Sequence, residues 1–460
     1  MGGPAAFRAS SPPLFSLFYL LSPMDSVRTL IVGAGVTGLA TAAALSEHGD
    51  SDYLILEADR EIGGWCKTVK KEGFVWDYSG HFFHFKHPEI ERWLVERMPG
   101  QNIRVVQKKS FIAYKGRFVD FPFQKNIHQL PQDEFIDCLH DVYFARSSDV
   151  KADEKHAAPP AANFREMLSA RYGRGICEKF LFPYNEKLYA CDLATLDVDA
   201  MGRFFPYADL TDIVRNMKRP DNASYNAIFT YPEGGAIEYV RAIASAVRPG
   251  AVAFEEALVA VDLQRKVVRT TSPDGGREIG FDRLVSSVPF NRFAAFCGLD
   301  HDAGLWTWNK VLVYNFGFDG KGQRDVHWAY YPARETAFYR VGWYDNIFDT
   351  DRLSVYVEVG FPRDAPIDAA SMRDRVLADL KREGVVSTQQ LVAEHSVVLD
   401  PAYVHVTARS IAEHRRMAAL LKARDVWSLG RYGGWTYCAI EDNIVEAREL
   451  VESWQSGHIS

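Results

Sequence analysis

Residues 28–38 read RTLIVGAGVTG and give the strongest indication of the fold. Its first half is a short apolar run that predicts a buried strand, and Gly33, Gly35 and Gly38 follow in G-x-G-x-x-G register. The run LATAAALSEHG at 39–49 has helical periodicity and ends on a glycine. A strand, a glycine turn and a helix in this order predict a dinucleotide-binding unit.

Each glycine has a physical task in that turn. The first permits a tight bend, the second lets a pyrophosphate approach the backbone, and the third lets the helix pack on the strand. The helix N-terminus then offers N–H groups and a partial positive charge to the phosphates. Glu57 ends the next predicted strand, 19 residues after the third glycine, where a carboxylate can accept from a ribose hydroxyl. This spacing indicates a dinucleotide site rather than a chance glycine-rich turn.

Composition restricts the classes of function. The chain has 460 residues, of which 47% are apolar and 25% charged, and its net charge is −7. These values exclude global disorder and a simple coiled coil. Acidic and basic residues are spread along the chain without a basic tract, so no nucleic-acid partner is expected. The six cysteines form no CxxC pair, so we expect idle thiols, no metal site and a cytoplasmic location.

Residues 1–24 are expected to be a leader that is disordered or not native. Their apolar run, LFSLFYLLS at 14–22, is far shorter than the roughly 20 residues that a membrane helix needs. The preceding flank has Arg8 as its only positive charge and no clear cleavage site, which argues against a signal peptide. No other run is long enough to span a bilayer, so no membrane contact is expected.

Beyond the first unit the periodicity changes. Helical periodicity dominates from about 125 to 215, whereas 310–360 alternates as strands do, in segments such as VLVYNFGF and SVYVEVGF. Residues 252–290 return to strands, and helices are expected at about 367–383 and 441–455. The chain therefore predicts an α/β start, a helical middle and an antiparallel region.

The segments after Glu57 narrow the choice of cofactor. IGG at 62–64, DYSGH at 77–81 and SSVP at 286–289 follow in order. They resemble the extended fingerprint of the large FAD-binding family of amine oxidases, protoporphyrinogen oxidases and UDP-galactopyranose mutases. The resemblance implies FAD as cofactor, held by Gly33, Gly35, Gly38, Glu57, Gly63, Gly64, Gly80, His81 and Arg431.

The same resemblance implies how the chain divides into domains. The expected fold is α/β, with a Rossmann-like FAD-binding domain, an inserted helical domain and an antiparallel β-sheet domain that holds the substrate. The FAD-binding domain would be discontinuous, and the ranges are 25–100, 225–300 and 415–460 for it, 125–215 for the helical domain, and 101–124 with 301–414 for the sheet domain.

Scattered segments resemble the eukaryotic-type UDP-galactopyranose mutases within that family. They are VDFPFQKNI at 119–127, PYNEKLY at 183–189, MGRFFP at 201–206, HWAYYPARETAFYR at 327–340 and GRYGGWTY at 430–437. By this resemblance the substrate would contact Phe123, Gln124, Asn185, Tyr189, Arg203, Tyr330, Arg340, Tyr403 and Tyr437. The catalytic residues would be His81, Arg203, Arg340 and Arg431. Arginine suits this role because its fork matches the oxygens of a diphosphate.

Ordinary structural roles stay open for several of these residues. Taken alone, Arg340 reads as a surface charge, Arg203 as a charge beside core aromatics, and Gln124 as a polar residue at a strand end. The chain also departs from the family's pattern, because Ser79 replaces the first glycine of a GGH triplet. Glu441 stands where a carboxylate would repel a diphosphate unless it were turned away.

The resemblance implies a mutase that interconverts the pyranose and furanose forms of UDP-galactose or a related nucleotide-linked hexose. Such an isomerase acts through an adduct between the sugar and N5 of reduced FAD, and NAD(P)H is a candidate reductant. The same FAD motifs suit an oxidase or dehydrogenase of the amine oxidase or protoporphyrinogen oxidase type. A non-enzymatic escort protein on the same fold is a third interpretation. The residues do not specify the sugar, the base or the oligomeric state.

Overall fold

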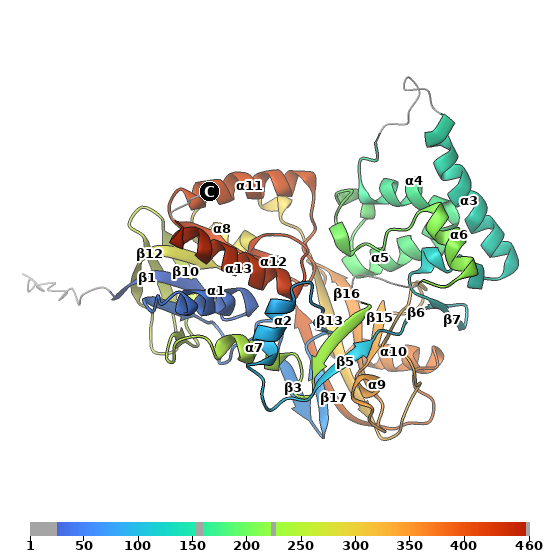
Figure 1. Cartoon of the computed structure of the whole chain (residues 1–460), viewed down its shortest axis with the longest axis horizontal. Coiled ribbons are helices and arrows are strands. Elements are labelled where there is room, and N and C mark those ends of the chain that lie inside the picture. Colours follow the sequence, from blue (N-terminus) through green and yellow to red (C-terminus); the bar gives the residue numbers. More distant parts are fainter. Residues whose placement is uncertain (1–24, 152–159, 222–226, 457–460) are drawn as a thin grey trace, which may run out of the picture.

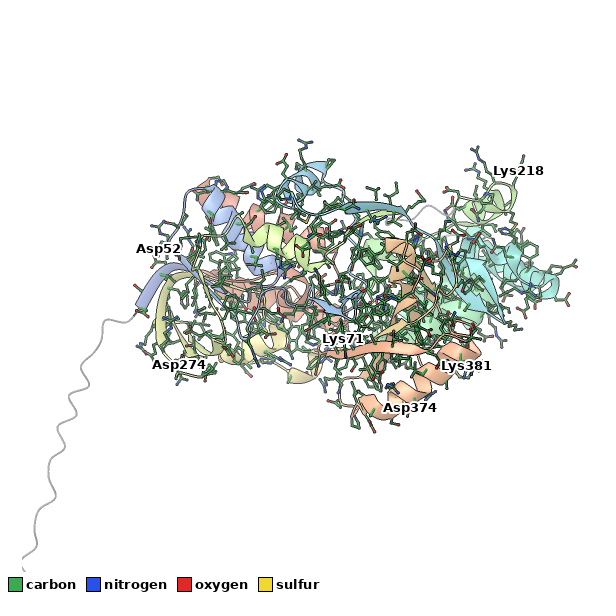
Figure 2. The ribbon with its side chains drawn as sticks, turned by 90° about the horizontal axis from the view of Figure 1, so that it is seen from below. Asp52, Lys71, Lys218, Asp274, Asp374 and Lys381 are labelled. Atoms are coloured by element: carbon green, nitrogen blue, oxygen red, sulfur yellow. The ribbon has the colours of Figure 1, made fainter. Side chains whose placement is uncertain are left out.

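The computed structural model describes residues 25–151, 160–221 and 227–456 (Figure 1). The leader expected at 1–24 lies outside these ranges. The molecule is elongated, with the first sheet at one end and the helical region at the other. Figure 2 gives a second view of this arrangement, in which Asp52 lies near one end and Lys218 at the opposite end.

A mixed sheet organises the first end of the molecule. Among the described residues it has seven strands, in the order β10-β11-β12-β1-β2-β9, with β18 paired to β12. Its bounds are β1 Asp25–Val32, β2 Tyr53–Leu56, β9 Val252–Ala253, β10 Ala257–Asp262, β11 Val267–Thr271, β12 Glu278–Ser286 and β18 Val426–Ser428. The central strand β1 runs parallel to both β2 and β12, and it is fully buried along its apolar half.

Helices cover this sheet. Helix α1 (Val36–Glu47) follows β1 directly and packs beside α13 (Ile440–Gln455), so the C-terminus returns to the first strand–helix unit. The other helices of this end are α2 Pro88–Val95, α7 Ile237–Ala244, α8 Phe290–Phe296, α11 Ala408–Lys422 and α12 Gly430–Gly433. Almost every residue of α1 is buried, which explains its run of small alanines.

A second sheet forms the middle of the molecule. The described part contains seven strands in the order β17-β13-β16-β15-β14-β6-β7, all antiparallel neighbours except β14 and β6. The bounds are β6 Ser110–Tyr114, β7 Arg117–Asp120, β13 Asn309–Phe318, β14 Trp328–Tyr330, β15 Arg340–Trp343, β16 Ser354–Pro362 and β17 Leu391–Leu399. Short helix α9 (Tyr344–Phe348) links β15 to β16, and α10 (Ala369–Arg382) follows β16.

The two faces of this sheet have different surroundings. Val355, Val357 and Val359 of β16 pack with residues of α10 in one apolar cluster. Tyr356 and Glu358 alternate with them and therefore point to the opposite face. That opposite face is the one that meets the nucleotide-binding end of the chain.

The helical region lies beyond the second sheet (Figure 1). Its helices are α3 Gln132–Lys151, α4 Phe164–Ile176, α5 Phe182–Tyr189 and α6 Leu210–Lys218. Side chains from the sheet region cap the end of α5, because Asn309 Nδ2 donates to the Leu188 carbonyl and His405 Nε2 lies 2.9 Å from the Tyr189 carbonyl. The helical region is thereby tied to the sheet that carries the site.

The stretch 101–124, which is predicted as part of the sheet domain, divides between two sheets. β5 (Ile103–Gln107) pairs with β8 (Ile228–Pro232) in a separate two-stranded ribbon. Only β6 and β7 of that stretch join the large sheet. A second ribbon joins β3 (Thr68–Lys71) to β4 (Phe74–Asp77). The wider division into three domains stays a prediction.

Candidate active site

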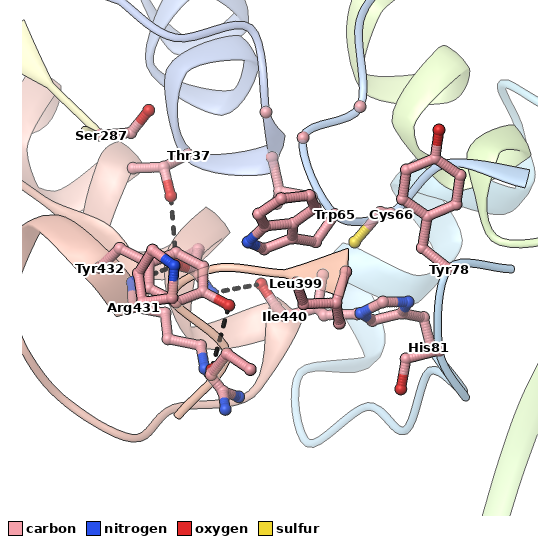
Figure 3. A pocket seen from close by; sticks show the side chains of 18 of the residues that line it. Thr37, Trp65, Cys66, Tyr78, His81, Ser287, Leu399, Arg431, Tyr432 and Ile440 are labelled. Carbon is pink, nitrogen blue, oxygen red and sulfur yellow. Dashed lines mark hydrogen bonds between the residues drawn. The ribbon is translucent and has the colours of Figure 1, made fainter. Parts of the chain in front are cut away.

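A cavity of about 750 Å³ lies between the first sheet and the inner face of the second (Figure 3). Its walls come from the glycine turn after β1, the end of β2, the segments 63–67 and 78–84, and the segments 399–403 and 429–443. Strands β14, β15 and β16 form its floor. Segments far apart in the sequence thus converge on one space.

The glycines of the first motif shape one end of this cavity. Gly33 adopts a φ of +100°, which favours glycine, and it turns the chain out of β1. A Cβ on Gly38 would run into the Gly33 carbonyl, so this glycine lets α1 pack on the turn and does not line the cavity. Gly35 and Gly64 lie beside each other, since a Cβ on Gly35 would be in van der Waals contact, 3.9 Å from the Gly64 Cα. Both glycines line the cavity, and the part of it beside them, the glycine gap, receives no side chain from either residue.

Glu57 is held in place before any ligand arrives. Its Oε2 accepts from the Ala34 N–H at 2.7 Å, and its Oε1 accepts from the Asp59 N–H at 2.8 Å. Each carboxylate oxygen keeps a further lone pair for a ribose hydroxyl. The glycine-lined gap and this acid fit the diphosphate and the ribose of a dinucleotide.

Arg340 and Glu358 form an ion pair in the cavity floor. They are direct neighbours on β15 and β16, with Arg340 Nη2 2.6 Å from Glu358 Oε1. Ser79 Oγ donates to the same carboxylate oxygen. Sequence reasoning missed Glu358, although the alternation in SVYVEVGF places it on the same face as Tyr356.

Arg431 enters the cavity among tyrosine rings. Its guanidinium lies 4.6 Å from the ring centroid of Tyr437, 5.1 Å from that of Tyr403 and 5.9 Å from that of Tyr432. Its Nε is buried without a hydrogen-bond partner among the described residues. Burial acts to lower the pKa of Arg431, but the three tyrosines raise it above its ordinary value. Arg431 therefore presents a cation that no acidic side chain of the described ranges neutralises.

A carboxamide holds the backbone of Arg431. Asn443 Oδ1 accepts from the Arg431 N–H at 2.9 Å and from Thr37 Oγ1 at 3.1 Å. Glu446 accepts from the Gly430 N–H at 2.8 Å. One helix, α13, thus links the start of α1 to the segment that carries Arg431.

His81 lines the cavity beside these charges. Its Nδ1 is buried and has no hydrogen-bond partner within the described part of the chain. Burial, followed by the positive charge of Arg431, lowers the pKa of His81 to about 4. The ring is therefore neutral near pH 7.

Most residues predicted for the site line this one cavity. They are Gly33, Gly35, Glu57, Gly63, Gly64, Gly80, His81, Tyr330, Arg340, Tyr403, Arg431 and Tyr437. The departure at Glu441 is harmless, because its carboxylate turns away and accepts from the N–H groups of Lys86 and His87.

Four residues predicted to hold the nucleotide do not line the cavity. Phe123 is fully buried and stacks on Phe180, and Gln124 donates to the Pro206 carbonyl. Asn185 donates to the Leu181 carbonyl, and Tyr189 is buried within the helical region. Packing occupies these side chains, so a role in base binding stays a prediction.

Arg203 likewise lies outside the cavity lining, although its neighbour Phe204 is part of it. Its side chain is exposed and forms an ion pair with Asp442 at the start of α13. Its predicted catalytic role therefore has no counterpart in this arrangement and stays a prediction.

No group of three potential metal ligands occurs in the described ranges. The six cysteines are free thiols, and burial raises the pKa of Cys66 to about 12. No helix within the described ranges is long and apolar enough to cross a membrane.

Residues 36–329 match the model of the flavin-containing amine oxidoreductases. The chain belongs to this family. The match confirms the predicted recognition of the FAD-binding superfamily, the α/β fold class and FAD as the cofactor of this flavoenzyme. The glycine gap, Glu57 and His81 are the features of this flavoprotein that fit FAD.

Matches to curated relatives are local. Protoporphyrinogen oxidase 2 of Arabidopsis thaliana is 33% identical over 104 residues, which are 22% of this chain and 20% of that protein. An inactive all-trans-retinol 13,14-reductase of Danio rerio is 40% identical over 58 residues, which are 13% and 9% of the two chains. The chain thus spans a fifth or less of these relatives' length.

Likeness to solved structures extends over nearly the whole chain. Reduced UDP-galactopyranose mutase has a TM-score of 0.84 and 24% identity, with 94% of each chain covered. A fatty acid isomerase from P. acnes has a TM-score of 0.63 and 14% identity, with 94% of this chain and 100% of that chain covered. At these identities the likeness establishes the shared fold.

Proposed function

We propose that this flavoenzyme interconverts the pyranose and furanose forms of a nucleotide-linked hexose, UDP-galactose or a relative. The observation that carries the proposal is that Arg340 and Arg431 open onto one cavity lined by tyrosines. Two guanidinium groups and several phenol hydroxyls suit a diphosphate and a sugar. The overall likeness to a UDP-galactopyranose mutase supports the same choice.

The side chains of the cavity define what the protein contributes. Reduced FAD, when bound, would supply the nucleophile toward the anomeric carbon of the sugar. Arg431 would bind the diphosphate as it leaves and keep it near for its return. Arg340 would orient the same group from the floor, and the phenol hydroxyls of Tyr330, Tyr403 and Tyr437 would donate to it.

Neutral His81 suits such a site. With a pKa of about 4, its ring adds no positive charge beside Arg431 and can accept or donate one hydrogen bond at the cofactor. Glu57 and the glycine gap would hold the ribose and the diphosphate of the dinucleotide. The reactants would thus be fixed by groups that need no rearrangement.

An oxidase or dehydrogenase of the amine oxidase or protoporphyrinogen oxidase type is the second candidate. The local identity to protoporphyrinogen oxidase favours it. A cavity for an apolar substrate would not be expected to hold an arginine without an acidic partner, because a buried, uncompensated cation is costly. The mutase is therefore the preferred function, and the oxidase is the alternative.

The test is an anaerobic assay with purified protein. Dithionite-reduced enzyme is incubated with a panel of nucleotide-linked hexopyranoses and hexofuranoses, and the products are separated by chromatography. We expect isomerisation by reduced enzyme and none by oxidised enzyme, and NAD(P)H in place of dithionite tests the reductant. Absence of isomerisation, together with bleaching of the flavin by amines or porphyrinogens, would replace the mutase with the oxidase.

A further inference from the structure

The two arginines of the cavity carry unequal effective charge. Glu358 is 1% exposed, and its carboxylate lies 2.6 Å from the guanidinium of Arg340, whose side chain is 19% exposed. This acid neutralises most of the field of Arg340 at a distance. Arg431 has tyrosine rings around it and no acidic partner within the described ranges.

The geometry of Glu358 is that of a positioning residue. One carboxylate oxygen, Oε1, accepts from both Arg340 and Ser79. The other, Oε2, is buried without a hydrogen-bond partner in the described part of the chain. Ser79 lies two residues before His81, so the carboxylate links the strand pair β15–β16 to the segment that runs along the cofactor end.

A buried carboxylate so close to a binding arginine lowers the affinity of the cavity for an anion, and this loss needs an explanation. An anion-binding cavity would hold a diphosphate more tightly without it, because the carboxylate repels the same ligand. Tight and uniform binding, however, does not accelerate a reaction in which the diphosphate must leave and return. By offsetting the charge of Arg340, Glu358 limits the affinity for the diphosphate, and it also holds the Arg340 guanidinium in its orientation.

We propose that Glu358 sets the anion affinity of the cavity by compensating Arg340, so that Arg431 is the principal anchor for a diphosphate. This inference rests on the proposed function for its natural ligand, a nucleoside diphosphate. The charge relation itself applies to any pyrophosphate group that enters the cavity. It predicts a gain of affinity when Glu358 is neutralised, whereas a merely structural role predicts a loss.

The first experiment measures binding of UDP and of inorganic pyrophosphate to the FAD-loaded protein by titration calorimetry. Glu358→Gln should bind both ligands about tenfold more tightly than wild type. With a nucleotide sugar that the enzyme isomerises, the KM and the kcat of Glu358→Gln should both be lower than those of wild type, because the diphosphate is released more slowly. Unchanged or weaker binding by a folded Glu358→Gln protein overturns the proposal.

A matched control removes a different buried carboxylate. Asp345 is fully buried and pairs with Lys321 at 2.7 Å, and it does not line the cavity. Asp345→Asn should leave the affinity for UDP and pyrophosphate unchanged. An equal gain of affinity in this variant would assign the effect to general loosening and overturn the proposal.

A second pair of variants keeps the test decisive if Glu358→Gln does not fold. The double variant Arg340→Gln/Glu358→Gln removes the pair without net charge change and should bind pyrophosphate within about threefold of wild type. Arg431→Gln should lose at least about tenfold. Equal losses in the two proteins would contradict the proposed division of roles.

The outcomes also separate this inference from the proposed function. If wild-type protein binds pyrophosphate and Glu358→Gln binds it more tightly, but no nucleotide sugar is isomerised, the function is wrong and the charge relation stands. If sugars are isomerised and Glu358→Gln gains no affinity, the function stands and this inference is wrong.

Discussion

The two ends of the cavity are built from different parts of the chain. At the cofactor end, glycines without side chains line the cavity, and backbone N–H groups hold Glu57. At the floor, the surface consists of side chains that project from three strands. Arg340 and Glu358 are paired directly opposite each other on the neighbouring strands β15 and β16. The first end depends on local chain geometry, and the second depends on how distant strands align.

This difference has consequences for what a substitution does. A side chain added at the cofactor end occupies the ligand's space, so binding is lost while the fold survives. A side chain removed from the floor leaves a charged partner behind in a buried place, so stability and function are lost together. Substitutions at the two ends should therefore differ in what they disturb.

Gly35→Leu should have an effect that is confined to the cofactor. The new side chain would extend from the turn into the cavity beside Gly64, while its Cβ meets no atom closer than 3.9 Å. We expect FAD affinity to fall about a hundredfold, or ~2.7 kcal/mol, with an unchanged far-ultraviolet circular dichroism spectrum. Gly100→Leu, at an exposed position with open space, is the control. An unfolded Gly35→Leu protein would contradict the contrast.

Arg340→Ala should abolish turnover and also destabilise the protein. Its loss leaves the buried Glu358 carboxylate unpaired, which costs about 3–5 kcal/mol in the free energy of unfolding. Urea unfolding and flavin absorbance measure the two effects separately. We expect FAD to remain bound, and loss of flavin would instead assign Arg340 to the cofactor. Glu358→Gln added to Arg340→Ala should restore most of the lost stability.

His81 should make stability depend on pH. Its pKa is about 4 in the folded chain, below the ordinary value of 6.5, because burial and Arg431 disfavour the charged ring. Between these values the unfolded chain binds a proton that the folded chain does not, so the free energy of unfolding falls as pH falls. His81→Gln should remove about 2–3 kcal/mol of that decrease in FAD-free protein.

Urea unfolding at pH 7 and pH 4.5 measures this difference for wild type and His81→Gln. The comparison between the two proteins is needed because Asp77 acts in the opposite sense. Burial raises the pKa of Asp77 to about 7, so the folded chain holds its proton where the unfolded chain releases it. Identical pH dependence in both proteins would mean that His81 is solvated and not held neutral by its surroundings.

Arg203→Ala should have the smallest effect. The side chain is exposed, and its ion pair with Asp442 is worth less than about 1 kcal/mol in water. Turnover should stay within about threefold of wild type, a change of less than ~0.7 kcal/mol. A much larger loss would mean that the segment 201–206 brings Arg203 to the substrate, as the family resemblance implies.

Several residues of the cavity were predicted from the sequence. Gly33, Gly35 and Glu57 were identified from a short motif, and all three line the cavity. The motif succeeds because a strand, a turn and a helix fix its geometry within about thirty residues. Arg340 and Arg431 were identified only through resemblance of longer segments, and they also line it.

The misses have a common cause. Glu358 was overlooked because nothing in its own segment reveals the arginine opposite, which depends on the pairing of β15 with β16. Phe123 and Tyr189 are buried outside the cavity lining, and because an aromatic residue serves packing equally well, their predicted contact with the substrate stays a prediction. The segment 103–107 pairs with β8 and not with the large sheet, since strand pairing is decided by distant partners.

The dinucleotide unit and the alternation that gives the second sheet two faces can be predicted from the order of the amino acids, because they follow from local backbone geometry and from the periodicity of apolar residues. The FAD family was predicted from the resemblance of longer segments. The folded chain was needed to show that an acid compensates one arginine and not the other, and that the exposed Arg203 pairs with Asp442. The charge balance of a site depends on which side chains come into contact, and contacts between residues that are distant in the sequence depend on how the whole chain packs.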